Sequence, residues 1–284
     1  MGPLIRNISD TARWVAVFRA EESERPDAIF NDPFARRLAG ERGEKIANAI
    51  TFSTKNSWSF VARTFLFDEY IKQHLNLGYD MMINLACGLD TRPYRMDLPP
   101  SLTWIEVDLP GILNYKESIL AGEKPNCIVE KIHLDLANRD ARVELFTHLG
   151  SKAGKALVIS EGLISYLDDK EVGLLAQDLS AQNSFERWVL DYFSPGLLEM
   201  IQKEMGSFMK EGNAILKFAP EEGAEFFLSH GWKVIESKSN LKIAESLQRL
   251  PVEMMPLAAV PEPEGPKGSF PWTGVGLFEN INKA

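Results

Sequence analysis

Short apolar runs rich in branched residues recur from residue 81 onward, and polar or helix-periodic segments separate them. This alternation is typical of strands in a parallel sheet that are connected by crossover helices. The helices predicted between the strands include Pro110–Ala121, Asp140–Leu149 and Asp169–Ala181. Seven strands are predicted, at Met81–Ala86, Leu102–Asp108, Cys127–Leu134, Ala156–Ser160, Trp188–Phe193, Trp232–Ser237 and Gly274–Glu279.

The first 80 residues have a helical pattern instead of a strand pattern. Ser9 or Asp10 could cap a first helix, and Asp32-Pro33 could start a second. Residues Ser57–Leu75 form a long helix in this reading. We therefore expect residues 1–78 to form a helical cap over the sheet.

The remaining residues divide between a sheet core and one insert. Residues 79–194 and 229–284 are predicted to form the core, and residues 195–228, which contain few strand formers, a second helical insert. An insert at this place commonly shapes a substrate pocket. Six prolines between Pro251 and Pro271 exclude a continuous helix or a central strand there. We expect an extended loop that leads into the last strand, and one α/β domain over residues 1–284.

Composition and charge narrow the class of protein. The chain has 284 residues, 45% hydrophobic and 25% charged, with a formal net charge of −9. A nucleic-acid partner normally requires a basic footprint, so none is expected. The N-terminus lacks a basic start followed by an apolar run, and no run of about 18 apolar residues occurs. We expect a soluble, cytoplasmic protein without a membrane partner; the sequence does not decide between a monomer and a homodimer.

Cysteine and histidine positions point to neither a disulfide nor a metal. The two cysteines, Cys87 and Cys127, lack metal-ligand spacing, and Cys87 lies in the candidate ligand turn. The four histidines are scattered without the close pairing of a helix-borne metal site. We expect free thiols in a reducing compartment and no tightly held metal.

Candidate ligand residues follow four of the predicted strands. In an open parallel sheet the ligand crevice lies beyond the carboxyl ends of the strands. Small residues after the first strand allow close approach of a ligand, and Gly88 could adopt a positive φ. The carboxylate after the second strand suits the ribose hydroxyls of an adenosine ligand, and the third strand end could pair with adenine. The candidates are Ala86, Gly88, Asp108, Asp135, Leu136 and Glu161.

A nicotinamide dinucleotide would use the same crevice, but its pyrophosphate needs a glycine-rich turn. Here the turn has one glycine, and Asp90 lies where a phosphate would bind. An adenosyl ligand that carries a sulfonium and an ammonium suits this acidic crevice better. Arg63 or Arg92 could pair with the carboxylate of such a ligand.

Each candidate also has a simpler structural interpretation. Gly88 alone could be an ordinary turn, Asp108 could cap the next helix, and Asp135 could cap a turn. Glu161 could pair with a buried arginine, and Glu106 could be either a second ribose contact or a charge at the sheet edge. Only the four strand ends together favour a ligand site.

The motifs resemble those of the leucine carboxyl methyltransferase superfamily, in its branch of bacterial and fungal S-adenosylmethionine-dependent, polyketide-type O-methyltransferases. The resemblance covers roughly residues 9–240, in six separated motifs in the same order. These are Asp10-Thr11-Ala12 with Arg19-Ala20-x-Glu22-Ser23, Phe30-Asn31-Asp32-Pro33-Phe34-Ala35, Ala62-Arg63-Thr64, Gly88-Leu89-Asp90-Thr91-Arg92 with Tyr94-Arg95, Glu106-Val107-Asp108-Leu109-Pro110 with Lys116, and Glu161-Gly162-Leu163-x-x-Tyr166-Leu167.

The resemblance implies a class I, Rossmann-like methyltransferase fold with S-adenosyl-L-methionine as cofactor and S-adenosyl-L-homocysteine as product. By similarity, Arg63 looks like the residue that binds the methionine carboxylate, and Gly88 like the glycine under the ligand. Asp108 looks like the ribose acid and Glu161 like the acid near the ammonium. Asp135 and Leu136 look like the adenine contacts. Cys87 departs from the family, which more often has glycine or alanine there.

The expected reaction is O-methylation of a carboxylate on a small molecule. An ionised carboxylate needs no general base, and Arg19, Arg63 or Arg92 could orient it while Tyr166 lines the acceptor pocket. A phenolic acceptor would need a base, for which His133 or Tyr166 are the candidates. A protein carboxyl terminus is a third acceptor. A nicotinamide-dependent oxidoreductase and a noncatalytic nucleoside-binding protein remain alternatives from other classes.

Overall fold

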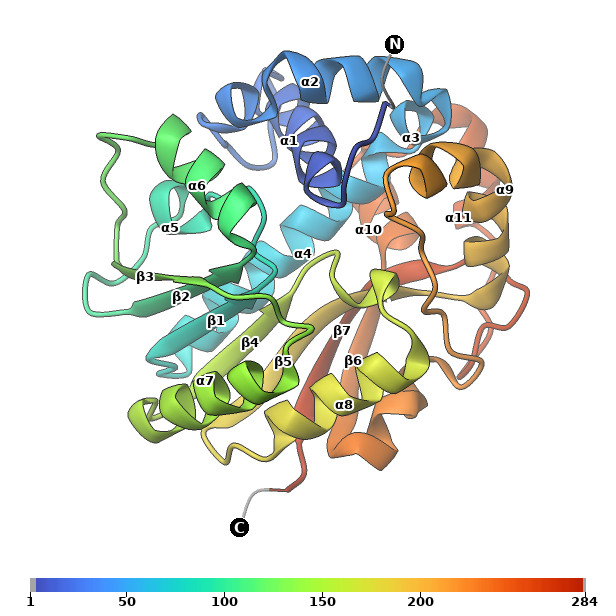
Figure 1. The fold of residues 1–284 in the computed structure, drawn as a ribbon. Coiled ribbons are helices and arrows are strands. Elements are labelled where there is room, and N and C mark those ends of the chain that lie inside the picture. Colours follow the sequence, from blue (N-terminus) through green and yellow to red (C-terminus); the bar gives the residue numbers. More distant parts are fainter. Residues whose placement is uncertain (1–3, 283–284) are drawn as a thin grey trace.

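A seven-stranded sheet runs through the centre of the molecule (Figure 1). The computed structural model describes residues 4–282. The strand order is β3-β2-β1-β4-β5-β7-β6, and only β7 runs antiparallel to its neighbours. The strands are β1 (Met81–Leu85), β2 (Thr103–Asp108), β3 (Ile128–His133), β4 (Ala156–Ser160), β5 (Phe185–Phe193), β6 (Trp232–Ser239) and β7 (Thr273–Asn280). The predicted seven-stranded, mostly parallel sheet is confirmed.

The strand order places a crevice at one edge of the sheet. From β1 the chain moves outward through β2 and β3, and it then returns to place β4 on the other side of β1. Loops that leave β1 and β4 therefore diverge in opposite directions at the carboxyl ends of these strands. Such a switch point is where open α/β sheets bind ligands.

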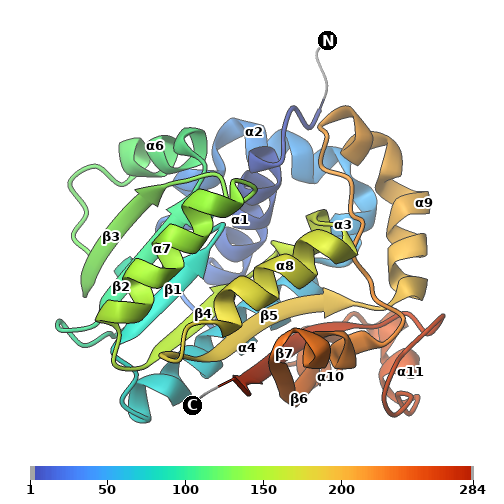
Figure 2. The ribbon, with the colours of Figure 1, turned by 60° about the horizontal axis from the view of Figure 1, so that its bottom comes forward.

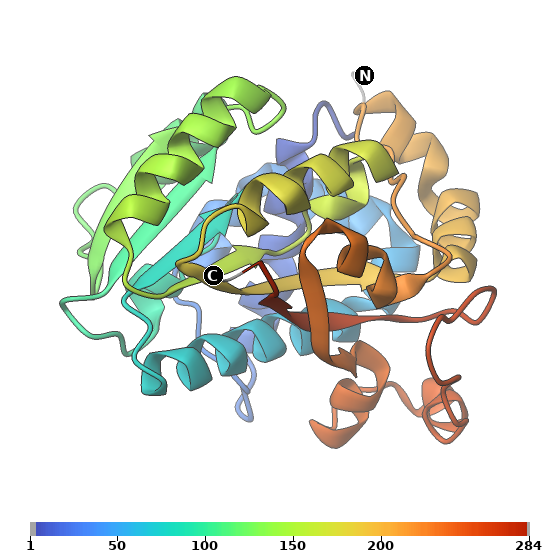
Figure 3. The same ribbon diagram turned by 90° about the horizontal axis from the view of Figure 1, so that it is seen from below.

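Helices cover both faces of the sheet, because its central strands are apolar on both sides (Figure 3). On one face α7 (Arg139–Lys152) and α8 (Asp169–Ser180) lie side by side (Figure 2) and pack through Phe146 and Leu179 against Trp188. On the other face α4 (Ser57–Asn76) packs Phe67 and Tyr70 against Trp104. The helix predicted at Ser57–Leu75 is thus confirmed. It packs against this face of the sheet and is not part of the N-terminal cap. Next to it lies α10 (Asn240–Ser246).

A third apolar cluster lies above the carboxyl ends of the strands (Figure 1). It joins α1 (Ser9–Ser23), α2 (Ala35–Ala49) and α6 (Pro110–Ile119) to α9 (Pro195–Glu211). Trp14, Leu38, Ile112 and Met205 are among its buried members. Short helices α3 (Thr51–Lys55) and α5 (Arg92–Arg95) complete this region. The N-terminal helices and α9 thus enclose the ligand edge of the sheet.

Several local predictions differ from the structure. Neither Ser9 nor Asp10 caps α1, whose N-cap is Ile8; Asp10 instead accepts a bond from the Arg6 N–H and pairs with Arg42. The second helix begins at Ala35, two residues beyond Pro33. Only the first half of the insert is α-helical, because α9 ends at Glu211 and a 3-10 helix, η2 (Gly223–His230), follows later.

The prediction that the proline-rich segment is a simple extended loop is wrong. It begins with the 3-10 helix η3 (Val252–Met254) and the short helix α11 (Met255–Ala258). Pro256 lies in the first turn of α11, where a helix needs no backbone N–H donor. The rest of the segment, to Trp272, is without regular structure. Across residues 4–282, none of the helices combines the length and the apolar character that crossing a membrane requires.

Candidate active site

The turn after β1 holds its backbone in a left-handed conformation at two positions. Ala86 and Gly88 both have φ 51°. The positive φ predicted for Gly88 is confirmed; that of Ala86 is unusual for a residue with a side chain. A Cβ atom on Gly88 would lie 3.2 Å from the Cβ of Ala12 in α1, so the turn also passes close to the N-terminal cap. A ligand that lies on this turn meets backbone instead of side chains.

Asp108 at the end of β2 fastens this turn. Its Oδ2 accepts a hydrogen bond of 2.6 Å from the Gly88 N–H, and its Oδ1 accepts one of 2.7 Å from the Leu109 N–H. Burial raises the pKa of Asp108, and the two N–H donors oppose that rise. Each carboxylate oxygen has a further lone pair. Asp108 therefore orients the turn and can still accept bonds from two ligand hydroxyls.

The ends of β3 and β4 bring further predicted residues to the same cavity. Asp135 and Leu136 line its outer part, and the exposed Asp135 accepts a 2.9 Å bond from the Ala137 N–H. Glu161, after β4, also lines it. Its two oxygens accept bonds from different arginines, Oε1 from Arg63 at 3.1 Å and Oε2 from Arg92 at 2.8 Å.

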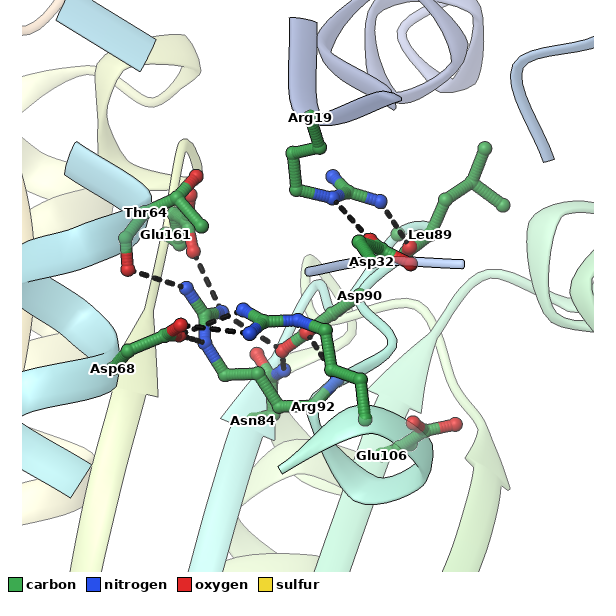
Figure 4. A network of polar contacts seen from close by, with 12 residues as sticks. Arg19, Asp32, Thr64, Asp68, Asn84, Leu89, Asp90, Arg92, Glu106 and Glu161 are labelled. Carbon is green, nitrogen blue, oxygen red and sulfur yellow. Dashed lines mark hydrogen bonds and ion pairs between the residues drawn. The ribbon is translucent and has the colours of Figure 1, made fainter. Parts of the chain in front are cut away.

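Arg92 is fully engaged by acidic partners (Figure 4). Its Nε lies 2.6 Å from Asp68 in α4, and its Nη1 lies 3.0 Å from Asp90 and 2.8 Å from Glu161. Its side chain is only 3% exposed. Arg95 pairs with the same Asp68 at 2.7 Å. Arg92 thus links the turn to α4 and orients Glu161. Because its donors are used in these contacts, Arg92 is less suited to hold a ligand carboxylate.

Arg63 reaches the centre of the cavity from α4. It donates to Glu161 at 3.1 Å and to Oδ2 of Asp191 at 2.9 Å. The other Asp191 oxygen accepts a 2.6 Å bond from the Gly162 N–H. Burial raises the pKa of Asp191, against the effect of Arg63. Arg63 is therefore held in place by two carboxylates from neighbouring strands, β4 and β5.

Asp191 was not among the residues predicted from the sequence. It lies near the carboxyl end of β5, and the rule that singled out the ends of four strands applies equally to the fifth. Asn84 and Asp90, joined by a 2.7 Å bond, also line the cavity. Both lie in or next to the predicted turn and could have been found by the same rule.

One large cavity joins all these residues. Its volume is about 1130 Å³, and it extends from the strand ends to α9 and to the segment 253–273. Ala86, Gly88, Asp108, Asp135, Leu136, Glu161, Arg63, Arg19 and Tyr166 all line it. The structure thus brings these nine residues to the same space.

The Leucine carboxyl methyltransferase family model matches residues 12–180. The chain belongs to this family. Among its relatives is a protein of Streptomyces avermitilis, 29% identical over 78% of this chain and 82% of its own length. Another, from Rhodococcus jostii, is 28% identical over 90% of this chain and 94% of its own length. Both are named "Putative S-adenosyl-L-methionine-dependent methyltransferase". The family, enzyme class and cofactor expected from the sequence are confirmed.

A solved structure supports the fold. A DUF574 family protein from Streptomyces avermitilis superimposes with a TM-score of 0.59, at 11% identity, over 95% of this chain and 97% of that protein. At this identity the likeness concerns the fold alone. The predicted class I methyltransferase fold is confirmed by this likeness together with the strand order.

Tyr166 and Arg19, the predicted acceptor-side residues of this leucine carboxyl methyltransferase family member, have different surroundings. The Tyr166 hydroxyl donates to Oγ1 of Thr11 at 3.2 Å, and burial raises its pKa. Arg19 donates to Asp32 at 2.9 Å and to the Leu89 carbonyl at 2.6 Å (Figure 4). Arg19 therefore connects α1 to the loop before α2 and to the cofactor turn.

Two further residues considered from the sequence lie away from the cavity. His133 is exposed, and its Nε2 lies 3.1 Å from Oδ1 of Asn114. Glu106 is neither a ribose contact nor a surface charge, because its Oε1 pairs with Lys116 at 2.7 Å and both side chains are 0% exposed.

The two cysteines, Cys87 and Cys127, are free and buried.

Proposed function

We propose that this methyltransferase transfers the methyl group of S-adenosyl-L-methionine to the carboxylate of a small organic acid. The proposal joins two parts of the cavity. The strand ends and Arg63 supply groups for the cofactor, and Tyr166 supplies a group for the acceptor. The observation that carries it is the buried Tyr166 hydroxyl in the cavity wall, which donates to Oγ1 of Thr11 at 3.2 Å.

The residues at the strand ends fit the cofactor. The left-handed turn at Ala86 and Gly88 offers bare backbone, and Asp108 offers acceptor lone pairs to ribose hydroxyls. Glu161 suits an ammonium, and Arg63 suits a carboxylate as a bidentate partner. Asp90 at the same turn would repel a pyrophosphate. Bound here, the sulfonium supplies an electrophilic methyl group that an acceptor oxygen can attack in line.

The acceptor side suits an oxygen that is already ionised. Burial raises the pKa of Tyr166, so its hydroxyl keeps its proton at neutral pH and donates to Thr11. Such a donor can bind and orient an acceptor carboxylate. It cannot readily accept the proton of a phenol. The second base considered for a phenol, His133, is exposed and does not line the cavity.

The role left to the protein is orientation. A carboxylate with an ordinary pKa near 4 is ionised at neutral pH, so no proton needs to be removed before attack. Holding the reacting atoms in line can by itself supply a large part of the rate acceleration. Arg63 is fixed by Glu161 and Asp191, and Tyr166 is fixed by Thr11. This arrangement supports catalysis by positioning.

Label transfer tests the proposal. The protein is incubated with methyl-labelled S-adenosyl-L-methionine and a panel of organic acids and phenols, and the products are treated with mild alkali. Methyl esters release the label as methanol, whereas methyl ethers and methylamines retain it. We expect alkali-labile label from acids; label found in alkali-stable products would contradict the carboxylate assignment.

Two tyrosine variants sharpen the test. Tyr166→Phe removes the hydroxyl, and we expect transfer to acids to fall by about tenfold, the value of one hydrogen bond to a charged group. Tyr94→Phe is the matched control, because Tyr94 packs against Phe34 and does not line the cavity. Equal rates in the two variants would remove Tyr166 from the acceptor site.

A further inference from the structure

The cavity is larger than one cofactor needs. Pockets for one drug-sized ligand measure roughly 300–1,000 Å³, and S-adenosyl-L-methionine is a ligand of that size. The cavity measures about 1130 Å³. Its cofactor residues lie at the ends of the strands and at Arg63 in α4, whereas its wall continues to α9 and to the segment 253–273. The part beyond the strand ends is therefore a chamber for the acceptor.

The wall of this chamber is apolar and adaptable. It includes Phe52 and Trp58 from the N-terminal helices, Met200 and Met205 from α9, and Leu241 and Met254 from the C-terminal part of the chain. Methionine side chains are unbranched and flexible, so they fit apolar ligands of irregular or variable shape. Figure 1 shows α3, α9 and α11 on the same side of the molecule. Segments far apart in the sequence thus build one apolar wall.

The apolar wall continues onto the outer surface. Leu257 and Val260 line the cavity and are also 51% and 43% exposed. They therefore lie at its mouth. Val252 and Met255, which do not line the cavity, add exposed apolar surface beside them, at 82% and 45%. Exposed apolar residues at the mouth of a pocket favour a binding surface there.

We propose that the acceptor is a carboxylic acid with a long hydrocarbon chain. This inference rests on the proposed function, because it places the acceptor carboxylate at Tyr166. The chain lies along α9 and leaves the cavity past Leu257 and Val260. A short acid would leave most of the chamber unfilled and most of its apolar wall without contact.

A chain-length series tests the inference. Straight-chain acids from butyrate to palmitate are titrated into the protein by calorimetry, with and without S-adenosyl-L-homocysteine. Burial of each added methylene is expected to tighten binding by about two- to fourfold until the chain leaves the cavity. Equal affinity for all chain lengths would overturn the inference, and so would a rigid fused-ring acid that binds more tightly than every straight chain.

Two variants locate the chain at the mouth. Leu257→Asp is expected to weaken palmitate binding by about tenfold and to leave butyrate binding unchanged. Leu77→Asp is the matched control, because Leu77 is also an exposed leucine and lies outside the cavity, at the end of α4. Equal palmitate affinity in both variants would contradict an exit past Leu257.

The series also separates this inference from the proposed function. S-adenosyl-L-homocysteine binding with a flat chain-length series rejects the hydrocarbon chain and leaves methyl transfer intact. A lack of S-adenosyl-L-homocysteine binding rejects the proposed function. The titrations made without it still decide whether the chamber selects long chains.

Discussion

At the scale of single residues, the site depends on positions whose backbone or protonation departs from the ordinary. Ala86 has φ 51° although it is not glycine, a conformation that costs about 1–2 kcal/mol. The bonds from Gly88 and Leu109 to Asp108 hold the neighbouring turn in place. The positive φ of Gly88 followed from its residue type, whereas nothing in the sequence distinguishes Ala86 from an alanine at the end of a strand.

His74 gives a prediction for the pH dependence of stability. It is buried at the end of α4, and burial lowers its pKa while its Nδ1 donates to the Tyr70 carbonyl at 2.6 Å. Below about pH 6.5 the unfolded chain therefore binds more protons at this ring than the folded protein. The stability that the neutral ring contributes is complete above that pH and is lost as the pH falls toward the lower, folded pKa.

Between about pH 7.5 and about pH 5.5 we expect the free energy of unfolding of the wild type to fall. In His74→Gln it should fall by less, and the difference should be on the order of 1 kcal/mol. Urea unfolding at the two pH values measures this difference. The exposed His148 supplies the control, since His148→Gln removes a ring that stays in water. Identical pH dependence in the wild type and His74→Gln would show that His74 titrates alike in both states.

At the scale of elements, helix packing above the strand ends is close enough to require glycine. A Cβ atom on Gly43 in α2 would lie 2.6 Å from the Arg13 carbonyl oxygen of α1. Gly43→Ala is therefore expected to destabilise the protein by about 1–3 kcal/mol, although alanine is the better helix former. In α9 a Cβ atom on Gly206 would meet nothing within 4 Å.

Gly206→Ala is accordingly expected to stabilise the protein by about 0.5–1 kcal/mol. The opposite signs of the two variants, measured by urea unfolding, test the contact between α1 and α2. A gain in stability from both variants would show that α1 and α2 do not approach so closely.

The buried pair of Glu106 and Lys116 joins β2 to α6. Burial raises the pKa of Glu106 and would lower that of Lys116, whereas their 2.7 Å ion pair opposes both effects and favours the charged forms. Lys116→Met leaves the acid without its partner and should cost about 3–5 kcal/mol of stability. Adding Glu106→Gln should restore most of this loss, because no buried charge then remains.

Thermal and urea unfolding of the single and double variants measure this coupling. Lys45→Met, which breaks an exposed pair with Glu41 at 3.4 Å, should change stability by less than about 1 kcal/mol. A double variant as unstable as Lys116→Met alone would mean that the methionine, and not the unpaired acid, causes the loss.

The prediction of helices and loops from the sequence failed where a local sequence pattern is compatible with more than one structure. The apolar runs predicted all seven strands, and the central strands β1 and β4 are buried on both faces, as in a parallel core. The segment after Pro251 was predicted as a loop because prolines exclude a long helix, yet a short helix accommodates Pro256 in its first turn. The second half of the insert after Glu211 is mostly irregular, since its packing depends on tertiary contacts that composition does not record.

At the scale of the whole molecule, the site could be predicted because one geometric rule places the ends of parallel strands at a common edge. Gly88, Asp108, Asp135 and Glu161 meet there as predicted. What the sequence could not show is the pairing among the charges. Arg92 is occupied by three carboxylates, and the partner of Arg63 on β5, Asp191, becomes evident only from their distance.

The size of the cavity likewise emerges only at this scale. Its wall combines the N-terminal helices, α9 and the segment after Pro251, and no local pattern predicts how such segments meet. The proposed substrate therefore rests on the folded molecule, whereas the cofactor could already be expected from the strand ends.

Calorimetric titration with S-adenosyl-L-homocysteine, beside a nicotinamide dinucleotide, tests the central claim most directly. We predict micromolar binding of S-adenosyl-L-homocysteine to the wild type and at least about tenfold weaker binding to Asp108→Ala. Binding to Asp97→Ala should be unchanged, because Asp97 is an exposed acid outside the cavity. Micromolar binding of the dinucleotide without binding of S-adenosyl-L-homocysteine would contradict the account.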